Sequence, residues 1–188
     1  MENLGRKIAS IVVERGKFIL RSGKESEHYL DMRRLYAHPD LFNDVVDALW
    51  FKANQRTTCV IGKGLGGIPL ASVMASRHKV KLCAIRDEQK GYGLQKQIEG
   101  YTPNRMDVVT IVDDVFTTGS SMKEARDVLQ REKNVNIAKY VAVVNREEGD
   151  PNSLGGEFDY LFTGRELLRY FDEERQKNSI KLRKDKIQ

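Results

Sequence analysis

The sequence has 188 residues, and its 40% hydrophobic and 31% charged residues are the balance of a folded globular protein rather than of a disordered chain. No stretch approaches the ~20 apolar residues of a membrane-spanning helix, and the first ten residues lack the apolar core of a signal peptide. We therefore expect neither a membrane protein nor a secreted one. The two cysteines, Cys59 and Cys83, lie in apolar runs without metal-ligand spacing, which argues against a structural zinc site and indicates a reducing, cytoplasmic setting.

The excess of positive charge lies at the C-terminal end. The formal net charge is +5, but residues 175–188 contain six basic residues and one acidic residue. Without them the charges of the remaining chain balance, so the sequence does not predict a globally basic nucleic-acid-binding domain. We interpret residues 171–188 as a basic helix end or tail in solvent, with a role in binding nucleic acid or an anionic surface as the alternative.

The spacing of apolar residues predicts helices and strands that alternate along the chain. A helix is expected over 4–13, ended by Gly16, and a second amphipathic helix over 42–50 follows a loop. The expected strands are 57–62, 81–86, 107–114, 138–145 and 158–163, and the helices between them are 66–78 and 121–132, with a polar, glycine-punctuated stretch at 87–100. The strongest strand is 107–114, because it is apolar on both faces like a central parallel strand.

The last helix is predicted to begin at a capping box. Thr163 and Glu166 have the spacing of this motif, and they directly follow the apolar run of the last strand. The alternation of strands and helices predicts an α/β fold, with a parallel sheet and helices on both of its faces. Such sheets bind ligands outside the carboxyl ends of their strands, so the residues at those ends are the first candidates for a site.

The most informative segment is IVDDVFTTGSSMKEA, residues 111–125, where the central strand gives way to a helix. Two carboxylates, Asp113 and Asp114, are followed by a loop of hydroxyl and glycine residues. The loop consists of Thr117, Thr118, Gly119, Ser120 and Ser121. Backbone N–H groups of such a loop form a cradle for a phosphate, and paired acids could bind sugar hydroxyls or a hydrated divalent cation. The alternative is a surface turn with an N-cap cluster, but two acids at the end of a buried strand need a reason to share a site.

This segment resembles the phosphoribosyl-pyrophosphate (PRPP) signature of type I phosphoribosyltransferases. The resemblance implies that Asp113 and Asp114 contact the ribose hydroxyls and that residues 117–121 hold the 5′-phosphate. It also implies Mg²⁺ as cofactor, held mainly by PRPP, with the two aspartates as its candidate protein ligands. The sequence contains no GxxxxGK[ST] phosphate loop, so kinase and NTPase functions lose their main support.

Four further segments are similar to orotate phosphoribosyltransferases, in the same order along the chain. They are residues 16–33 (substrate segment), 64–75 (pyrophosphate loop), 85–100 (catalytic loop) and 143–150 (orotate-binding segment). The resemblance implies one phosphoribosyltransferase domain over 1–170, with a small N-terminal hood at about 1–35. The implied reaction transfers the 5-phosphoribosyl group from PRPP to orotate, giving orotidine 5′-monophosphate and pyrophosphate.

The resemblance also implies roles for individual residues. Arg86 and Lys90 would supply cations from the catalytic loop and would share catalysis with Asp113, since stabilising a leaving pyrophosphate is mainly electrostatic. The orotate site would consist of Arg21, Tyr29, Thr117 and Arg146. A guanidinium group such as that of Arg146 suits a planar carboxylate because it offers two parallel donors. The catalytic loop would close over the active site of a neighbouring subunit, which implies a homodimer.

Four positions depart from the family pattern. They are Arg21 in place of a lysine, Gly66 where some members have a lysine, Asp87 in place of a lysine, and Tyr92 in place of a common histidine. Lys63 lies near Gly66 in the sequence. The change at Asp87 shifts the charge near pyrophosphate by two units, and Lys96 is a candidate for partly replacing the lost lysine. Two alternatives remain: a phosphoribosyltransferase for a purine or another base, and a non-catalytic PRPP-binding regulator.

Overall fold

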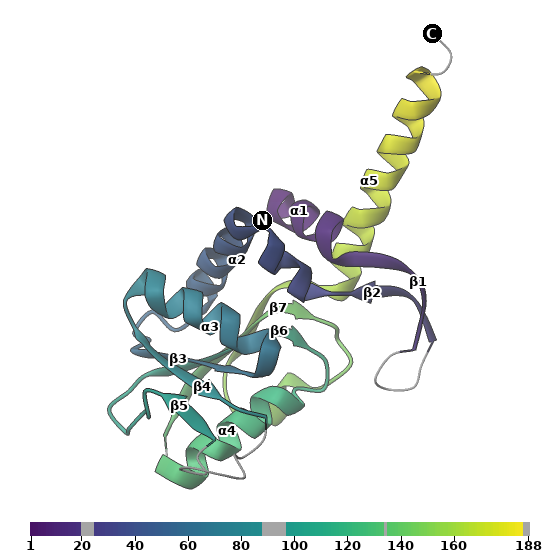
Figure 1. Ribbon diagram of the computed structural model, residues 1–188. Helices are drawn as coiled ribbons and strands as arrows, with labels where there is room; N and C mark the ends of the chain where they lie inside the picture. Colours follow the sequence, from purple (N-terminus) through teal and green to yellow (C-terminus); the bar gives the residue numbers. More distant parts are fainter. Residues whose placement is uncertain (20–24, 88–96, 134, 186–188) are drawn as a thin grey trace. The chain divides into compact units, whose positions relative to one another are not determined.

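Helices and strands alternate along the chain in the computed structural model, which describes residues 1–19, 25–87, 97–133 and 135–185 (Figure 1). The chain divides into two units. The first contains Met1–Phe42 and Phe162–Gln188, and the second contains Asn43–Leu161. Among the described residues, no helix has the length and apolar character needed to cross a bilayer.

A single mixed sheet forms the framework of the second unit. Its strands lie in the order β5 (Ile98–Gly100), β4 (Lys81–Ile85), β3 (Cys59–Lys63), β6 (Val109–Phe116), β7 (Ile137–Asn145) and β8 (Phe158–Thr163). The pairs β4–β3, β3–β6 and β6–β7 are parallel, as predicted, whereas the short β5 pairs antiparallel with β4. This antiparallel strand falls at the end of the stretch that the sequence predicts to be irregular.

Helices α3 (Gly64–His78) and α4 (Ser120–Lys133) cover opposite faces of this sheet, and β3 and β4 run between them in Figure 1. Ile61 and Ile111 belong to the apolar cluster that includes buried residues of α4. Gly62, the residue after Ile61 in β3, lies on the other face, where a Cβ would collide with the backbone of Gly67 in α3. Helix α2 (Pro39–Lys52) precedes β3, and a short 3₁₀ helix, Pro151–Leu154, precedes β8.

The central strand is displaced by two residues from its predicted range. It begins at Val109 rather than Asp107 and continues to Phe116, two residues past the acid pair of the candidate site. Residues Val109 through Asp113 are buried, which agrees with its predicted central position. Asp107 lies outside the strand because its carboxylate is engaged by four donors before the strand begins: Thr58, Lys81, Tyr101 and the backbone N–H of Asn104.

The first unit contains α1 (Glu2–Val12), the antiparallel pair β1 (Val13–Ile19) and β2 (Glu25–Leu30), a 3₁₀ helix (Met32–Ala37) and α5 (Gly164–Asp185). The predicted helix stop at Gly16 is wrong, because the chain passes directly from α1 into β1 and Gly16 lies inside that strand. The pairing of β1 with β2, in the register Val13 opposite Leu30, was not predicted.

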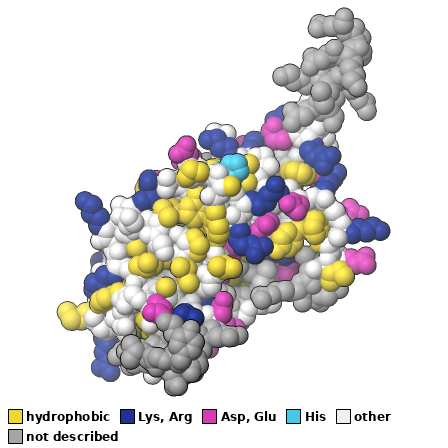
Figure 2. Space-filling view, in the orientation of Figure 1, with side chains coloured by type: hydrophobic (Ala, Val, Ile, Leu, Met, Phe, Trp, Pro, Cys, Tyr) yellow, Lys and Arg dark blue, Asp and Glu magenta, His cyan; other side chains and the backbone are white. Residues whose placement is uncertain are grey.

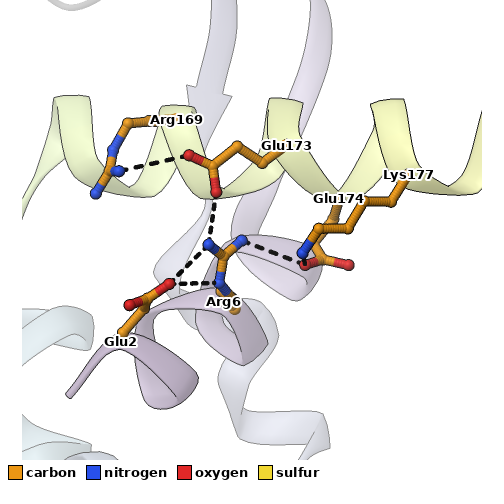
Figure 3. A network of polar contacts seen from close by, with 6 residues as sticks. All are labelled: Glu2, Arg6, Arg169, Glu173, Glu174 and Lys177. Atoms are coloured by element: carbon orange, nitrogen blue, oxygen red, sulfur yellow. Dashed lines mark hydrogen bonds and ion pairs between the residues drawn. The ribbon is translucent and has the colours of Figure 1, made fainter.

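The predicted capping box at the start of α5 is confirmed. The Thr163 backbone N–H donates to the Glu166 carboxylate at 2.7 Å, and the Glu166 N–H donates to the Thr163 hydroxyl at 3.1 Å. Further along α5, Arg6 of α1 forms ion pairs with Glu173 at 2.6 Å and with Glu174 at 3.3 Å (Figure 3). These contacts fix α1 against α5 within the first unit.

Charged side chains of both signs are mixed on the described surface. On the face that Figure 2 presents, lysine and arginine side chains lie among aspartates and glutamates. This distribution agrees with the balanced charge that the sequence has outside its C-terminal end.

Candidate active site

The candidate site lies at the edge of the sheet where the parallel strands end. In the pairing register, Gly62 is opposite Val112, Lys63 is opposite Ile85 and Phe116 is opposite Asn145. Four segments therefore follow strand ends at this one edge: residues 64–67 at the start of α3, Arg86 and Asp87, the loop 117–119, and Arg146. This is the edge at which open α/β sheets bind ligands.

The acid pair packs tightly against the turn that follows β3. Asp113 is 7% exposed, and Asp114 is half-buried. At Gly66 a Cβ would collide with Oδ1 of Asp114 and would come within 3.0 Å of Oδ1 of Asp113. A side chain at position 66 is therefore excluded while the two carboxylates keep this position, which gives a physical reason for glycine at one of the departures from the family pattern.

Burial and mutual repulsion dominate the electrostatics of the pair. Burial, and then the negative charge of Asp114, raise the pKa of Asp113 well above its ordinary value. The backbone N–H of Asp114 donates to Asp113 at 3.0 Å, and a hydrogen bond from the Ser121 side chain acts in the same direction; both lower the pKa without cancelling the rise. The site is thus built to receive a partner that donates hydrogen bonds or carries positive charge.

The hydroxyl-rich loop leads directly into α4. Gly119 has φ +75°, and a Cβ there would collide with the ring of Phe116, so only glycine fits this bend. The first turn of α4 starts at this bend, where the Lys123 N–H donates to the Gly119 carbonyl at 2.9 Å. The Thr118 hydroxyl lies 3.4 Å from that of Ser120. The N-terminus of a 14-residue helix and several hydroxyls therefore meet beside the acid pair, an arrangement that suits a phosphate.

The segment after β7 packs on this loop. The backbone N–H of Arg146 donates to the Phe116 carbonyl at 2.9 Å, and a Cβ at Gly149 would collide with the backbone of Thr117 and Thr118. The Arg146 guanidinium forms an ion pair with Glu148 at 2.9 Å. The structure thus places the backbone of Arg146 next to the candidate phosphate loop.

A buried lysine, Lys63, is the last residue of β3, directly before α3. Lys63, whose side chain is 9% exposed, forms ion pairs with Asp87 and with Glu124 of α4, the latter at 3.1 Å. The Arg86 guanidinium lies 3.7 Å from the carboxylate of Glu99 in β5. The pairing of Lys63 with Glu124 is not predicted from the sequence; the available signal is a charged residue that ends the buried run CVIGK.

Of the remaining predicted residues, the structure describes Tyr29. Tyr29 belongs to β2 in the first unit, where its ring centroid is 5.5 Å from that of Phe18. Arg21 and Lys90 lie outside the described residues, as do Tyr92 and Lys96.

The donor set at the acid pair suits Mg²⁺ that brings its own ligands. Within the described ranges, no group of three or more histidine, cysteine, aspartate or glutamate side chains could enclose a metal ion. Two carboxylates on one strand are what a hard cation uses when substrate phosphates and waters supply its other oxygens. Asp113 and Asp114 therefore fit a cation that arrives with a phosphorylated ligand.

Comparison with known proteins identifies the class to which this fold and site belong. The family model "Phosphoribosyl transferase domain" matches residues 31–161, a range that includes the acid pair, the hydroxyl loop and Arg146. The chain belongs to the phosphoribosyltransferase family.

Within this family the chain is similar to orotate phosphoribosyltransferases. It is 39% identical over 138 residues to that of Methanothermobacter thermautotrophicus, covering 73% of this chain and 75% of the relative. It is 37% identical over 175 residues to that of Sulfurisphaera tokodaii, covering 88% of each. The crystal structure of orotate phosphoribosyltransferase from Aeropyrum pernix matches with a TM-score of 0.79 and 33% identity, over 88% of this chain and 96% of the other.

Proposed function

We propose that this protein transfers the 5-phosphoribosyl group from PRPP to orotate, giving orotidine 5′-monophosphate and pyrophosphate, a step of pyrimidine nucleotide synthesis. The observation that carries the proposal is the buried acid pair beside a hydroxyl-rich helix N-terminus at the carboxyl edge of the sheet, in a chain whose relatives are orotate phosphoribosyltransferases. It makes the protein a pentosyltransferase.

The acid pair and the loop bind the donor at its two ends. Thr117 to Ser121 take the 5′-phosphate, because backbone N–H groups and hydroxyls converge there. Asp113 and Asp114 accept hydrogen bonds from the ribose hydroxyls, which relieves the repulsion between two neighbouring carboxylates. With both ends held, the anomeric carbon is fixed for attack by the base, and positioning of this kind lowers the barrier.

Bond cleavage separates charge, and the protein's cations stabilise the products of that separation. The bond from the anomeric carbon to pyrophosphate breaks through a state with oxocarbenium character while negative charge grows on the leaving group. Arg86 and Lys90 neutralise that charge from the segment after β4. Mg²⁺, bound with PRPP beside Asp113 and Asp114, would neutralise further charge and orient the leaving group.

The base site explains the choice of acceptor. The Arg146 guanidinium exchanges Glu148 for the orotate carboxylate, which it can bind through two parallel hydrogen bonds. By the family resemblance, Arg21 and Tyr29 would also contribute to binding orotate, and Thr117 would lie between base and sugar. A purine carries no such carboxylate, so Arg146 favours orotate over the alternative bases.

An assay with a panel of bases tests the proposal. With PRPP and Mg²⁺, we expect pyrophosphate release that depends on orotate and falls at least about a hundredfold in Lys90→Ala and Arg146→Ala. Arg56→Ala, which removes an exposed arginine of the same unit, is the control and should retain full activity. Activity only with a purine, or PRPP binding without turnover of any base, would replace this proposal by one of the two alternatives.

We further propose a cytoplasmic homodimer in which the segment around Lys90 serves the active site of the second subunit. The family resemblance supports the dimer. The two buried cysteines are free thiols, which supports a reducing compartment.

A further inference from the structure

Among the described residues at the site edge, Lys63 carries a buried charge that the proposed reaction leaves unused. A lysine with a 9% exposed side chain is rare, because a buried ammonium needs a charged or polar partner. Its partners are Asp87, which follows β4, and Glu124 on α4, so three segments of the edge meet at one ammonium group.

Lys63 is buried, whereas its two carboxylate partners are largely exposed to water. The side chains of Asp87 and Glu124 are 67% and 60% exposed. Burial alone would lower the pKa of Lys63, but the hydrogen bonds that its ammonium donates to Asp87 and Glu124 raise it above its ordinary value, so the side chain is charged. The lysine therefore always needs an anion, whereas either carboxylate can turn into solvent at little cost.

The cluster lies within reach of a ligand bound at the acid pair. A Cβ at Gly64 would come within 3.2 Å of the Asp87 carboxylate, and a Cβ at Gly66 would meet Asp113 and Asp114. The two glycines are two residues apart at the start of α3, so their Cα atoms are at most about 7 Å apart. The Lys63 cluster and the acid pair therefore adjoin neighbouring positions of one helix, which puts the diphosphate of a ribose bound at the acid pair near the cluster.

We propose that Lys63 binds the diphosphate group of PRPP and that Asp87 occupies this position in the free enzyme, competing with the ligand. The proposal deepens the proposed function and rests on it. Diphosphate replaces Asp87 on the ammonium because it brings more negative charge to a buried cation. Lys63 would thereby supply the positive charge that the family pattern places at position 87, and Asp87 together with Glu124 would balance the charge of the ammonium when no ligand is bound.

The test measures binding of inorganic diphosphate with Mg²⁺ by calorimetry, together with the KM for PRPP. Asp87→Asn should tighten diphosphate binding and lower the KM by about three- to tenfold, because it removes the competitor and leaves Lys63 paired with Glu124. Lys63→Met, which keeps the volume of the side chain but removes its charge, should weaken diphosphate binding and raise the KM for PRPP, each by at least about tenfold. In the Lys63→Met background, Asp87→Asn should change neither by more than about twofold.

Glu157→Gln is the charge-matched control, since it removes an exposed carboxylate that pairs with Lys139 elsewhere in the unit, and it should leave both values unchanged. Weaker or unchanged binding in Asp87→Asn would overturn the proposal, and so would equal tightening in the control or in the Lys63→Met background. Calorimetry requires no base, so its result separates this inference from the proposed function: orotate turnover without tightening contradicts only the inference, and tightening without orotate turnover contradicts only the choice of acceptor.

Discussion

Asp113 shows how a single residue trades stability for binding. It lies in the middle of a buried strand, beside a second carboxylate and under a glycine turn. Its raised pKa means that the folded protein holds a proton that the unfolded chain has already released at the same pH. A ligand that donates hydrogen bonds to the pair removes part of this penalty, which is a direct thermodynamic reason for affinity at this site.

The first prediction concerns the variant Asp113→Asn. Between the ordinary pKa of 3.8 and the raised value, the folded state binds more protons than the unfolded state, so the stability of the parent protein falls as pH rises through this window. The uncharged variant escapes the loss, and its free energy of unfolding should exceed that of the parent by about 1–3 kcal/mol near pH 8. The gain should vanish near pH 4, as measured by urea denaturation across pH, while affinity for PRPP falls. A difference that does not depend on pH would contradict this interpretation.

At the scale of elements, the edge of the sheet opposite the site is fastened by one carboxylate. Asp107 accepts hydrogen bonds from Thr58, which precedes β3, from Lys81, the first residue of β4, and from Tyr101, which follows β5. Burial acts to raise its pKa, but these donors and the Asn104 N–H outweigh burial and lower the pKa to about 2. Three neighbouring strands are therefore joined at their ends by a group that stays ionised throughout the physiological range.

The second prediction concerns Asp107→Asn. The depressed pKa contributes stability that is present above the ordinary value of 3.8 and is lost as pH falls toward about 2. The variant should lose about 1–3 kcal/mol of unfolding free energy at pH 7, because an amide replaces the charged acceptor, and the loss should shrink below pH 4. Chemical denaturation at pH 7 and pH 3 measures both values. The matched variant Tyr101→Phe, which removes one donor only, should lose less; an equal loss would place the stabilisation in the tyrosine instead.

The elements that the sequence predicts well are those whose burial is complete. Strands β3 and β6 begin with buried, mainly apolar runs, residues 59–62 and 109–112, and the capping box of α5 is a local pattern of two residues, so each is visible in one short window. The pair β1–β2 was missed because VERGKFI is largely exposed and its pairing depends on a partner a dozen residues away. The same difference decides which site residues can be predicted from the sequence. The acid pair and its loop are contiguous in the chain, whereas Lys63, Asp87 and Glu124 come together only in the folded protein.

At the scale of the whole molecule, the proposed dimer divides each active site between two chains. Lys90 would act in one subunit on a donor bound in the other, while Arg146 would act within its own subunit. Each site would then consist of residues from both chains, and no isolated subunit would be fully active.

The third prediction is that two inactive variants restore activity when mixed. Lys90→Ala and Arg146→Ala should each be inactive alone, but a mixed dimer contains one site with both residues intact. After subunit exchange at equal concentrations, the activity should return to about a quarter of that of the parent enzyme, since half of the dimers are mixed and each has one intact site. The measurement is orotate-dependent pyrophosphate release, with light scattering to establish the mass. No recovery from a stable, exchanging dimer would place Lys90 in its own subunit's site.

The close approach of Gly66 to the carboxylates limits how this site can be redesigned. A lysine or arginine at position 66 would add a cation here. Even the Cβ of an alanine at this position, however, would collide with the Asp114 carboxylate and come within 3.0 Å of that of Asp113. Position 87, with a side chain open to solvent, accepts almost any residue sterically. Restoring a lysine there would set it against Lys63, so the two positions must be engineered together.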